Sequence, residues 1–288
     1  PTATTPPPPT RPTPLPPPAP PPPAPPLARR APAQPTATAS PAGPPLGRHP
    51  PPGWARGHGS GGHKPAQRTI ADRMLTESRA VLELGAYSLA FPWFSLLPRG
   101  DGHPVLVLPG FGASDRSTGP MRLALRRLGY RPHRLQLGRN GGPSRTIRRG
   151  MRSRLDALNQ RYEQPVSIVG WSLGGVYARG LARRVPEQVR SVITLGSPFR
   201  SIEAQEGWTT PPVPTTAIYS KRDAVVPWQI AHETEGARRE SIEVDSSHFG
   251  LGHHPAVVVA VADRLAQEPA SWAPFQPAKP FRHLFPKS

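Results

Sequence analysis

Cysteine is absent from this 288-residue sequence, and lysine is rare. Without thiols the chain forms no disulfide bond and offers no thiolate ligand to a metal ion. Lysines and arginines together number 36, yet lysine occurs only at Lys64, Lys221, Lys279 and Lys287. The net charge of +18 is therefore carried almost entirely by arginine.

This arginine excess invites a nucleic-acid interpretation, but a compositional bias explains it more simply. Arginine, proline and alanine are the residues that a GC-rich coding sequence favours, and the arginines are scattered along predicted helices, most densely in residues 144–154. A basic face would hold nucleic acid or anionic lipid non-specifically and with strong salt dependence. No specific nucleic-acid partner is expected.

A long uninterrupted hydrophobic run is also missing. Residues 80–97 come nearest, but Glu83, Gly85 and Pro92 interrupt them, whereas a membrane span needs roughly 20 consecutive apolar residues. We predict a buried or docking helix here. The alternative is a helix that lies on a membrane surface or covers the functional site. The compartment stays open, with a cytoplasmic or membrane-peripheral location favoured.

Proline is plentiful, and its placement divides the chain. Residues 1–52 are dominated by proline, alanine and threonine, which cannot bury enough apolar surface to fold, and 53–66 continue as a Gly/His-rich linker. We predict a disordered arm over 1–66, a folded domain over 67–268 that opens with a helical segment at 67–97, and a tail over 269–288. The domain is long enough for one complete core.

Apolar runs and amphipathic stretches alternate along the domain. Strands are expected at 105–108, 130–137, 166–169, 189–195, 215–219 and 241–244, with helices starting near 120, spanning 144–162, following residue 172 and spanning 255–265. This alternation predicts an α/β fold with a mainly parallel, doubly wound sheet and helices on both faces. Residues 196–213 lack periodicity and are expected to form a short cap segment.

The sequence Gly170-Trp-Ser172-Leu-Gly174 ends one predicted strand and begins a helix. This context is typical of a nucleophile elbow, in which a serine sits on a tight strand-to-helix turn. Glycines two positions either side of the serine permit the close backbone approach. The simpler alternative is an ordinary glycine-rich turn.

A serine nucleophile needs a base and an acid that orients the base. Asp223 follows the predicted strand 215–219, and His248 follows the strand that ends at Val244, so both lie on later strand-end loops in the order Ser, Asp, His. Asp245 competes as the acid but lies too close to His248 in sequence to come from a separate strand end. The competing histidines are His232, His253 and His254, and the Ser-His-Phe-Gly setting favours His248.

Residues 105–265 resemble an α/β-hydrolase of the bacterial lipase/esterase kind. The resemblance rests on five blocks, GDGHPVLVLPGF, GWSLGG, VITLGSPF, YSKRDAVVPW and SHFGLG. It implies an α/β-hydrolase fold and a serine hydrolase that cleaves carboxylic esters through an acyl-enzyme, without cofactor or metal. It also implies Ser172 as nucleophile, His248 as base and Asp223 as orienting acid.

Two backbone amides are needed for an oxyanion hole. Leu173 follows the nucleophile, and Phe111 in Pro-Gly-Phe-Gly follows the first strand, although many relatives have His-Gly where this chain has Pro-Gly. Trp171, Phe111 and Phe199 are expected to make an apolar substrate pocket. Medium-chain esters fit this picture, as do thioesters and lipids.

Two other functions compete with ester hydrolysis. The same triad could transfer the acyl group to an alcohol or cleave a thioester. A protein of a different class would keep the fold without catalysis and bind nucleic acid or anionic membrane through its arginine-rich face. The partner expected first is a small-molecule or lipid ester, with membrane-surface contact through residues 80–97 as a further expectation.

Overall fold

The computed structural model describes residues 70–206, 209–234 and 236–286. The arm and linker predicted over residues 1–66 lie outside the described residues.

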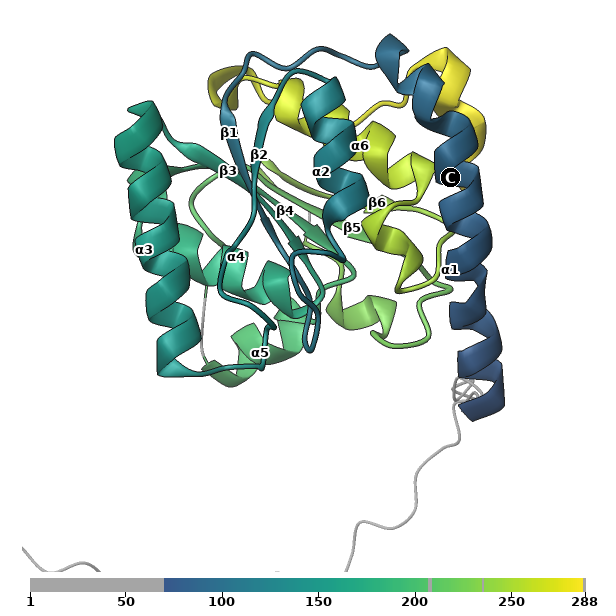
Figure 1. Cartoon of the computed structure of the whole chain (residues 1–288), viewed down its shortest axis with the longest axis horizontal. Coiled ribbons are helices and arrows are strands. Elements are labelled where there is room, and N and C mark those ends of the chain that lie inside the picture. The colour runs from purple at the N-terminus through teal and green to yellow at the C-terminus, as the bar shows by residue number, and fades with distance from the viewer. Residues whose placement is uncertain (1–69, 207–208, 235, 287–288) are drawn as a thin grey trace, which may run out of the picture. The chain divides into compact units, whose positions relative to one another are not determined.

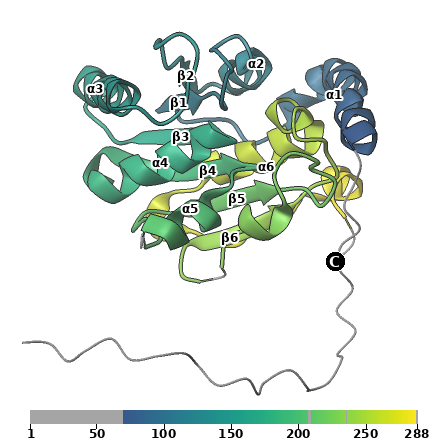
Figure 2. The same cartoon turned by 90° about the horizontal axis from the view of Figure 1, so that it is seen from below.

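A six-stranded, wholly parallel sheet forms the centre of the domain. Its strands are β1 (Pro104–Leu108), β2 (Arg131–His133), β3 (Val166–Trp171), β4 (Val189–Leu195), β5 (Thr215–Tyr219) and β6 (Arg239–Glu243). They lie side by side in the order β2-β1-β3-β4-β5-β6, and in Figure 2 their labels run in this order from the top of the sheet to the bottom. Both faces of β1 and β3 are buried, as the continuous apolar runs predict.

Helices cover both faces, which confirms the predicted doubly wound α/β class. The helices are α1 (Ile70–Ala90), α2 (Gly119–Arg127), α3 (Arg145–Tyr162), α4 (Leu173–Arg184), α5 (Phe199–Glu206) and α6 (Pro255–Ala266). In Figure 1, α3, α4 and α5 lie on one side of the sheet, and α2, α6 and α1 on the other. Because all six strands are parallel, their carboxyl ends lie at the same edge of the sheet, and the loops that follow the strands gather there.

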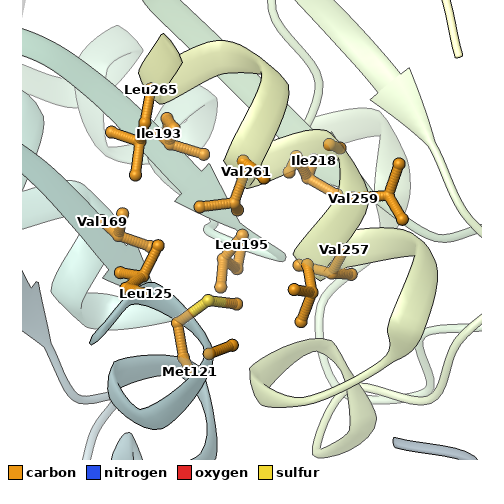
Figure 3. Close-up of a cluster of buried hydrophobic side chains, with 14 of the residues drawn as sticks. Met121, Leu125, Val169, Ile193, Leu195, Ile218, Val257, Val259, Val261 and Leu265 are labelled. Carbon is orange, nitrogen blue, oxygen red and sulfur yellow. The ribbon is translucent and has the colours of Figure 1, made fainter. Parts of the chain in front are cut away.

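Each face has its own hydrophobic core. Met121 and Leu125 of α2 and the valines of α6 pack on Val169, Ile193 and Leu195 of the sheet (Figure 3). Alternate strand residues point to the opposite face, where they meet α3 and α4. The C-terminal residues also join the first core, because Phe275, Phe281 and Leu284 pack against it.

Strand β2 is shorter than the predicted strand over 130–137. The backbone N–H groups of Leu135 and Gln136 donate to the Asp115 carboxylate, each at 2.9 Å, and Gln136 has a left-handed φ of 64°. These two N–H groups are therefore not available to pair with β1, and the chain turns away from the sheet.

The segment 196–213, predicted as a short cap without periodicity, differs from the prediction in one respect. It contains helix α5, although its sequence shows no helical periodicity.

Helix α1 and the 3₁₀ helix that follows it (Phe91–Leu96) bury one side and expose the other. Tyr87 and Phe94 are buried, and the Tyr87 hydroxyl donates to the Pro120 carbonyl at 2.8 Å. The outer side exposes Val81, Leu82, Leu89, Trp93 and Leu96. None of the helices in the described part of the chain is long and apolar enough to cross a membrane. Membrane-surface contact through 80–97 stays a prediction.

Candidate active site

The strand order reverses at one place in the sheet. The chain passes from β1 to the edge strand β2 and then returns to the other side of β1 as β3, so the loops after β1 and β3 leave the sheet in opposite directions. Ligands of open α/β sheets bind outside the carboxyl ends of the strands at such a point. Here Gly110 and Ser172 face each other there: a Cβ placed on Gly110 would lie 3.1 Å from Cβ of Ser172.

Ser172 sits on a strained turn between β3 and α4. Its φ of 53° and ψ of −123° are unusual for a residue with a side chain, and such strain is typical of functional sites. A Cβ on Gly170 would come within 2.5 Å of the backbone of Gly174 and Gly175, and one on Gly174 within 2.5 Å of the Leu108 carbonyl oxygen. The two flanking glycines therefore let strand, turn and helix approach as an elbow requires.

Asp223 and His248 come together beside this turn. His248 Nδ1 lies 2.7 Å from Asp223 Oδ2, and the two side chains are only 5% and 1% exposed. The other carboxylate oxygen, Oδ1, accepts hydrogen bonds from the backbone N–H groups of Val225 and Val226 at 2.9 and 2.7 Å. These bonds fix the carboxylate so that Oδ2 faces the imidazole.

Three contacts connect the elbow with the acid and histidine. The backbone N–H of Ser172 donates to the Leu195 carbonyl at 2.8 Å. Gly196 follows directly, and its missing side chain leaves room for the pair, because a Cβ there would lie 2.9 Å from Asp223 Oδ2 and 3.3 Å from His248 Nδ1. On the other side, the Trp171 indole N–H donates to the His248 carbonyl at 3.1 Å. The three predicted residues are therefore gathered at one edge of the sheet.

Two curated proteins resemble the chain in sequence. Both are named pimeloyl-[acyl-carrier protein] methyl ester esterase: that of Shewanella woodyi is 32% identical over 110 residues, covering 38% of this chain and 42% of the relative. That of Shewanella sp. strain MR-7 is 27% identical over 132 residues, covering 46% and 49%. The resemblance to esterases that the sequence predicts is confirmed, although the match spans less than half the length of either relative. The wholly parallel sheet with helices on both faces agrees with the α/β-hydrolase fold that this resemblance implies.

Solved structures of α/β-hydrolases are similar at a more distant level. A pyrethroid hydrolase of Sphingobium faniae superposes with a TM-score of 0.45 at 16% identity, covering 59% of this chain and 99% of its own. An α/β-hydrolase-fold protein of Nakamurella multipartita gives 0.45 at 14% identity, covering 58% and 93%. No protein-family model matches the chain.

The acid and the histidines that compete with Asp223 and His248 in the sequence have other partners in the structure. Asp245 pairs with Arg222 at 2.7 Å, away from the imidazole of His248. His254 Nδ1 accepts the Ala256 N–H at the start of α6, and His253 contacts the Ala80 carbonyl of α1 at 3.0 Å. Within the described ranges, no three His, Asp or Glu side chains gather as a metal ion would require.

The two amides expected to form an oxyanion hole belong to two segments that meet at Ser172, the start of α4 and the loop after β1. The N–H of Leu173 is in the first turn of α4, where no intrahelical acceptor exists. Phe111 lies in the loop after β1, which Asn140 holds: its side-chain amide donates to the Pro109 carbonyl at 3.0 Å, and its backbone carbonyl accepts the Gly112 N–H at 2.7 Å. The loop is thus fixed next to the elbow, and the role of the two amides stays a prediction.

The three residues expected to line a substrate pocket lie in different surroundings. Phe111 is 69% exposed, whereas Trp171 is 9% exposed and packs in the core behind His248. Phe199 is 1% exposed and lies under the guanidinium of Arg179, with 3.9 Å between the guanidinium carbon and the ring centre. Of the three, only Phe111 presents a largely open surface beside Ser172.

Two glutamates of α1 were missed by the sequence analysis. Glu77 accepts backbone hydrogen bonds from Ala224 at 3.2 Å, His248 at 3.1 Å and Phe249 at 3.0 Å. Glu83 accepts the N–H and hydroxyl of Ser247 at 2.9 and 2.7 Å. The Glu77 carboxylate therefore accepts hydrogen bonds from both the loop that carries Asp223 and the loop that carries His248. No sequence signal pointed to this, since Glu83 stood out only as an interruption of an apolar stretch.

Proposed function

We propose that the protein is a serine hydrolase that cleaves carboxylic esters through an acyl-enzyme. The observation that carries the proposal is the buried Asp223–His248 hydrogen bond next to the strained elbow of Ser172. A carboxylate on Nδ1 leaves Nε2 of the imidazole free to take a proton, which is what a serine nucleophile needs. The names of the two curated relatives describe methyl ester esterases, which supports this reaction class.

In the first half of the reaction, Ser172 Oγ attacks the carbonyl carbon of the ester while His248 Nε2 takes the hydroxyl proton. The C–O bond to the leaving alcohol then breaks, and the imidazolium returns the proton to that alcohol. Asp223 stabilises the imidazolium while it carries the extra charge. In the second half, His248 takes a proton from water, which attacks the acyl carbon. The bond between that carbon and Ser172 Oγ breaks, the imidazolium returns the proton to Oγ, and the acid leaves.

The negative oxygen of each tetrahedral intermediate needs donors already in place. The amides of Leu173 and Phe111 are the residues we assign to this role, and the N-terminal end of α4 adds its positive partial charge. Asn140 forms hydrogen bonds with Pro109 and Gly112, on either side of Phe111 in the sequence, so this donor is fixed before substrate binds.

The proposal is tested with p-nitrophenyl esters of increasing acyl length. We expect saturable hydrolysis by the full chain and complete, irreversible loss of that activity after treatment with a fluorophosphonate. Absence of hydrolysis across the series, together with no inactivation, would contradict the proposal. Tight, steeply salt-dependent DNA binding in that case would favour a non-catalytic basic protein.

The glutamate that bonds both loops gives a further prediction. In Glu77→Gln, the amide keeps one acceptor oxygen and its NH₂ faces a backbone N–H, so at least one of the three hydrogen bonds is lost and the others no longer go to a charged acceptor. Bonds to a charged acceptor contribute about 1.5–3 kcal/mol each, so we expect kcat to fall on the order of tenfold or more with little change in KM.

The matched control is Glu187→Gln, which makes the same substitution at an exposed site near the start of β4. It should leave kcat and thermal stability unchanged. If both variants retain full kcat, Glu77 does not position the histidine and the acid.

A further inference from the structure

A groove of about 270 Å³ lies on the face of the sheet that α3, α4 and α5 cover. Helix α4 contributes four apolar or aromatic residues to one wall, namely Leu173, Val176, Tyr177 and Leu181. They share one side of the helix because positions three or four apart lie above one another. Met151 of α3 and Ile202 of α5 form the opposite walls. The groove differs from the pocket that the sequence predicts around Trp171 and Phe199.

One end of the groove adjoins both amides that we assign to the oxyanion hole. Leu173 itself lines the groove and follows Ser172 directly. On the other side, the Phe111 ring lies against Gly142, where a Cβ would be 3.2 Å from it, and the next residue, Pro143, lines the groove. The carbonyl of a substrate bound by these two amides would therefore lie next to this end of the groove. From Leu173 to Leu181 the α4 wall is about 12 Å long, at the rise of an α-helix.

Beneath this apolar wall the groove contains one unpaired donor. Tyr177 is 9% exposed, and its hydroxyl has no hydrogen-bond partner among the described residues. Burial raises the pKa of this phenol and Arg148 partly opposes the shift, so the group stays a protonated donor at neutral pH. Buried hydroxyls are normally paired, so the donor calls for an acceptor on whatever occupies the groove.

The charged lining specifies the kind of acceptor. Arg148 of α3 and Arg184 of α4 both line the groove, and none of the lining residues that the structure describes is acidic. The Arg148 guanidinium and the Tyr177 phenol between apolar walls match a ligand that is apolar along its length and carries an anionic group. A carboxylate offers two acceptor oxygens to these donors.

We propose that this groove binds the acyl chain of the substrate, and that Tyr177 and Arg148 select acyl chains bearing a carboxylate remote from the scissile ester. Substrates of this class are half-esters of dicarboxylic acids. The inference rests on the proposed ester hydrolysis and specifies which acyl groups that reaction accepts.

The test compares two p-nitrophenyl esters of equal chain length, an octanoate and the octanedioate half-ester. We expect kcat/KM of the wild-type protein to favour the half-ester at least tenfold. Tyr177→Phe, which keeps the ring and its packing, should reduce that preference roughly tenfold, and Arg148→Gln should reduce it further at low salt. The acetate ester, whose acyl group is too short to extend along the groove, is measured with every variant as the reference substrate.

Tyr130→Phe is the matched control, because among the described residues that hydroxyl is also buried without a partner, but it packs in the core on the other face of the sheet, with α2 and α6. It should leave the preference intact. Ile202→Trp, which fills the groove, should lower kcat/KM for both eight-carbon esters at least tenfold relative to the acetate. An unchanged ratio in Tyr177→Phe and unchanged chain-length dependence in Ile202→Trp, with acetate still hydrolysed, would overturn the groove assignment alone. Failure to hydrolyse any ester would overturn the proposed function itself.

Discussion

Ser172→Ala is expected to lower kcat/KM for p-nitrophenyl esters on the order of 10⁴-fold or more. The substitution removes the only oxygen that we assign to attack the carbonyl, and leaves the oxyanion amides and the groove in place. Alanine tolerates the elbow conformation about as well as serine, since the strain resides in φ and in the Cβ. We therefore expect an unchanged melting temperature and little change in substrate binding. Initial rates and thermal unfolding measure the two effects separately.

The control for this variant is Ser191→Ala, in β4. Ser191 is half-buried and shares a 3.1 Å hydroxyl contact with Ser167, so the substitution repeats the chemical change away from the elbow. Its rate should remain within about twofold of the wild type. A loss of only a few-fold in Ser172→Ala would show that another group is the nucleophile.

Asp223→Asn is expected to lower kcat by roughly 10³- to 10⁴-fold. The amide oxygen can still accept from Val225 and Val226, which turns the NH₂ toward His248 Nδ1. Nδ1 must then be the unprotonated nitrogen, so the proton moves to Nε2 and the imidazole cannot take one from Ser172. The fold should survive, because the loop keeps both of its backbone hydrogen bonds.

Asp245→Asn provides the matched comparison, because Asp245 is the nearest alternative acid and pairs with Arg222 on the surface. We expect it to retain most of the wild-type kcat. The reverse result, with Asp245→Asn inactive and Asp223→Asn active, would require a different acid for the histidine.

Much of the fold and the proximity of Ser172, Asp223 and His248 could be predicted because local rules and topology agree. Glycines at 170 and 174 permit the tight turn that the structure contains, and the parallel sheet brings the ends of β3, β5 and β6 to one edge. Asp223 and His248 follow two of those strands, so their proximity follows from the alternation of strands and helices alone.

The rest could not be predicted because it depends on contacts between distant segments. Strand β2 ends early because Asp115 captures two of its backbone donors, which no local pattern reveals. Glu77 joins loops about 150 and 170 positions further along the chain. The groove beside α4 likewise requires the spacing of α3, α4 and α5, and periodicity gave no indication of α5.

Covalent labelling tests the central claim most directly. The wild-type protein is incubated with a fluorophosphonate, digested and sequenced by tandem mass spectrometry, with Ser172→Ala and Asp223→Asn treated in parallel. The account predicts one adduct per chain, located on Ser172, formed much more slowly in Asp223→Asn and absent in Ser172→Ala. An adduct on a different residue, or ester hydrolysis that continues with Ser172 unmodified, would contradict it.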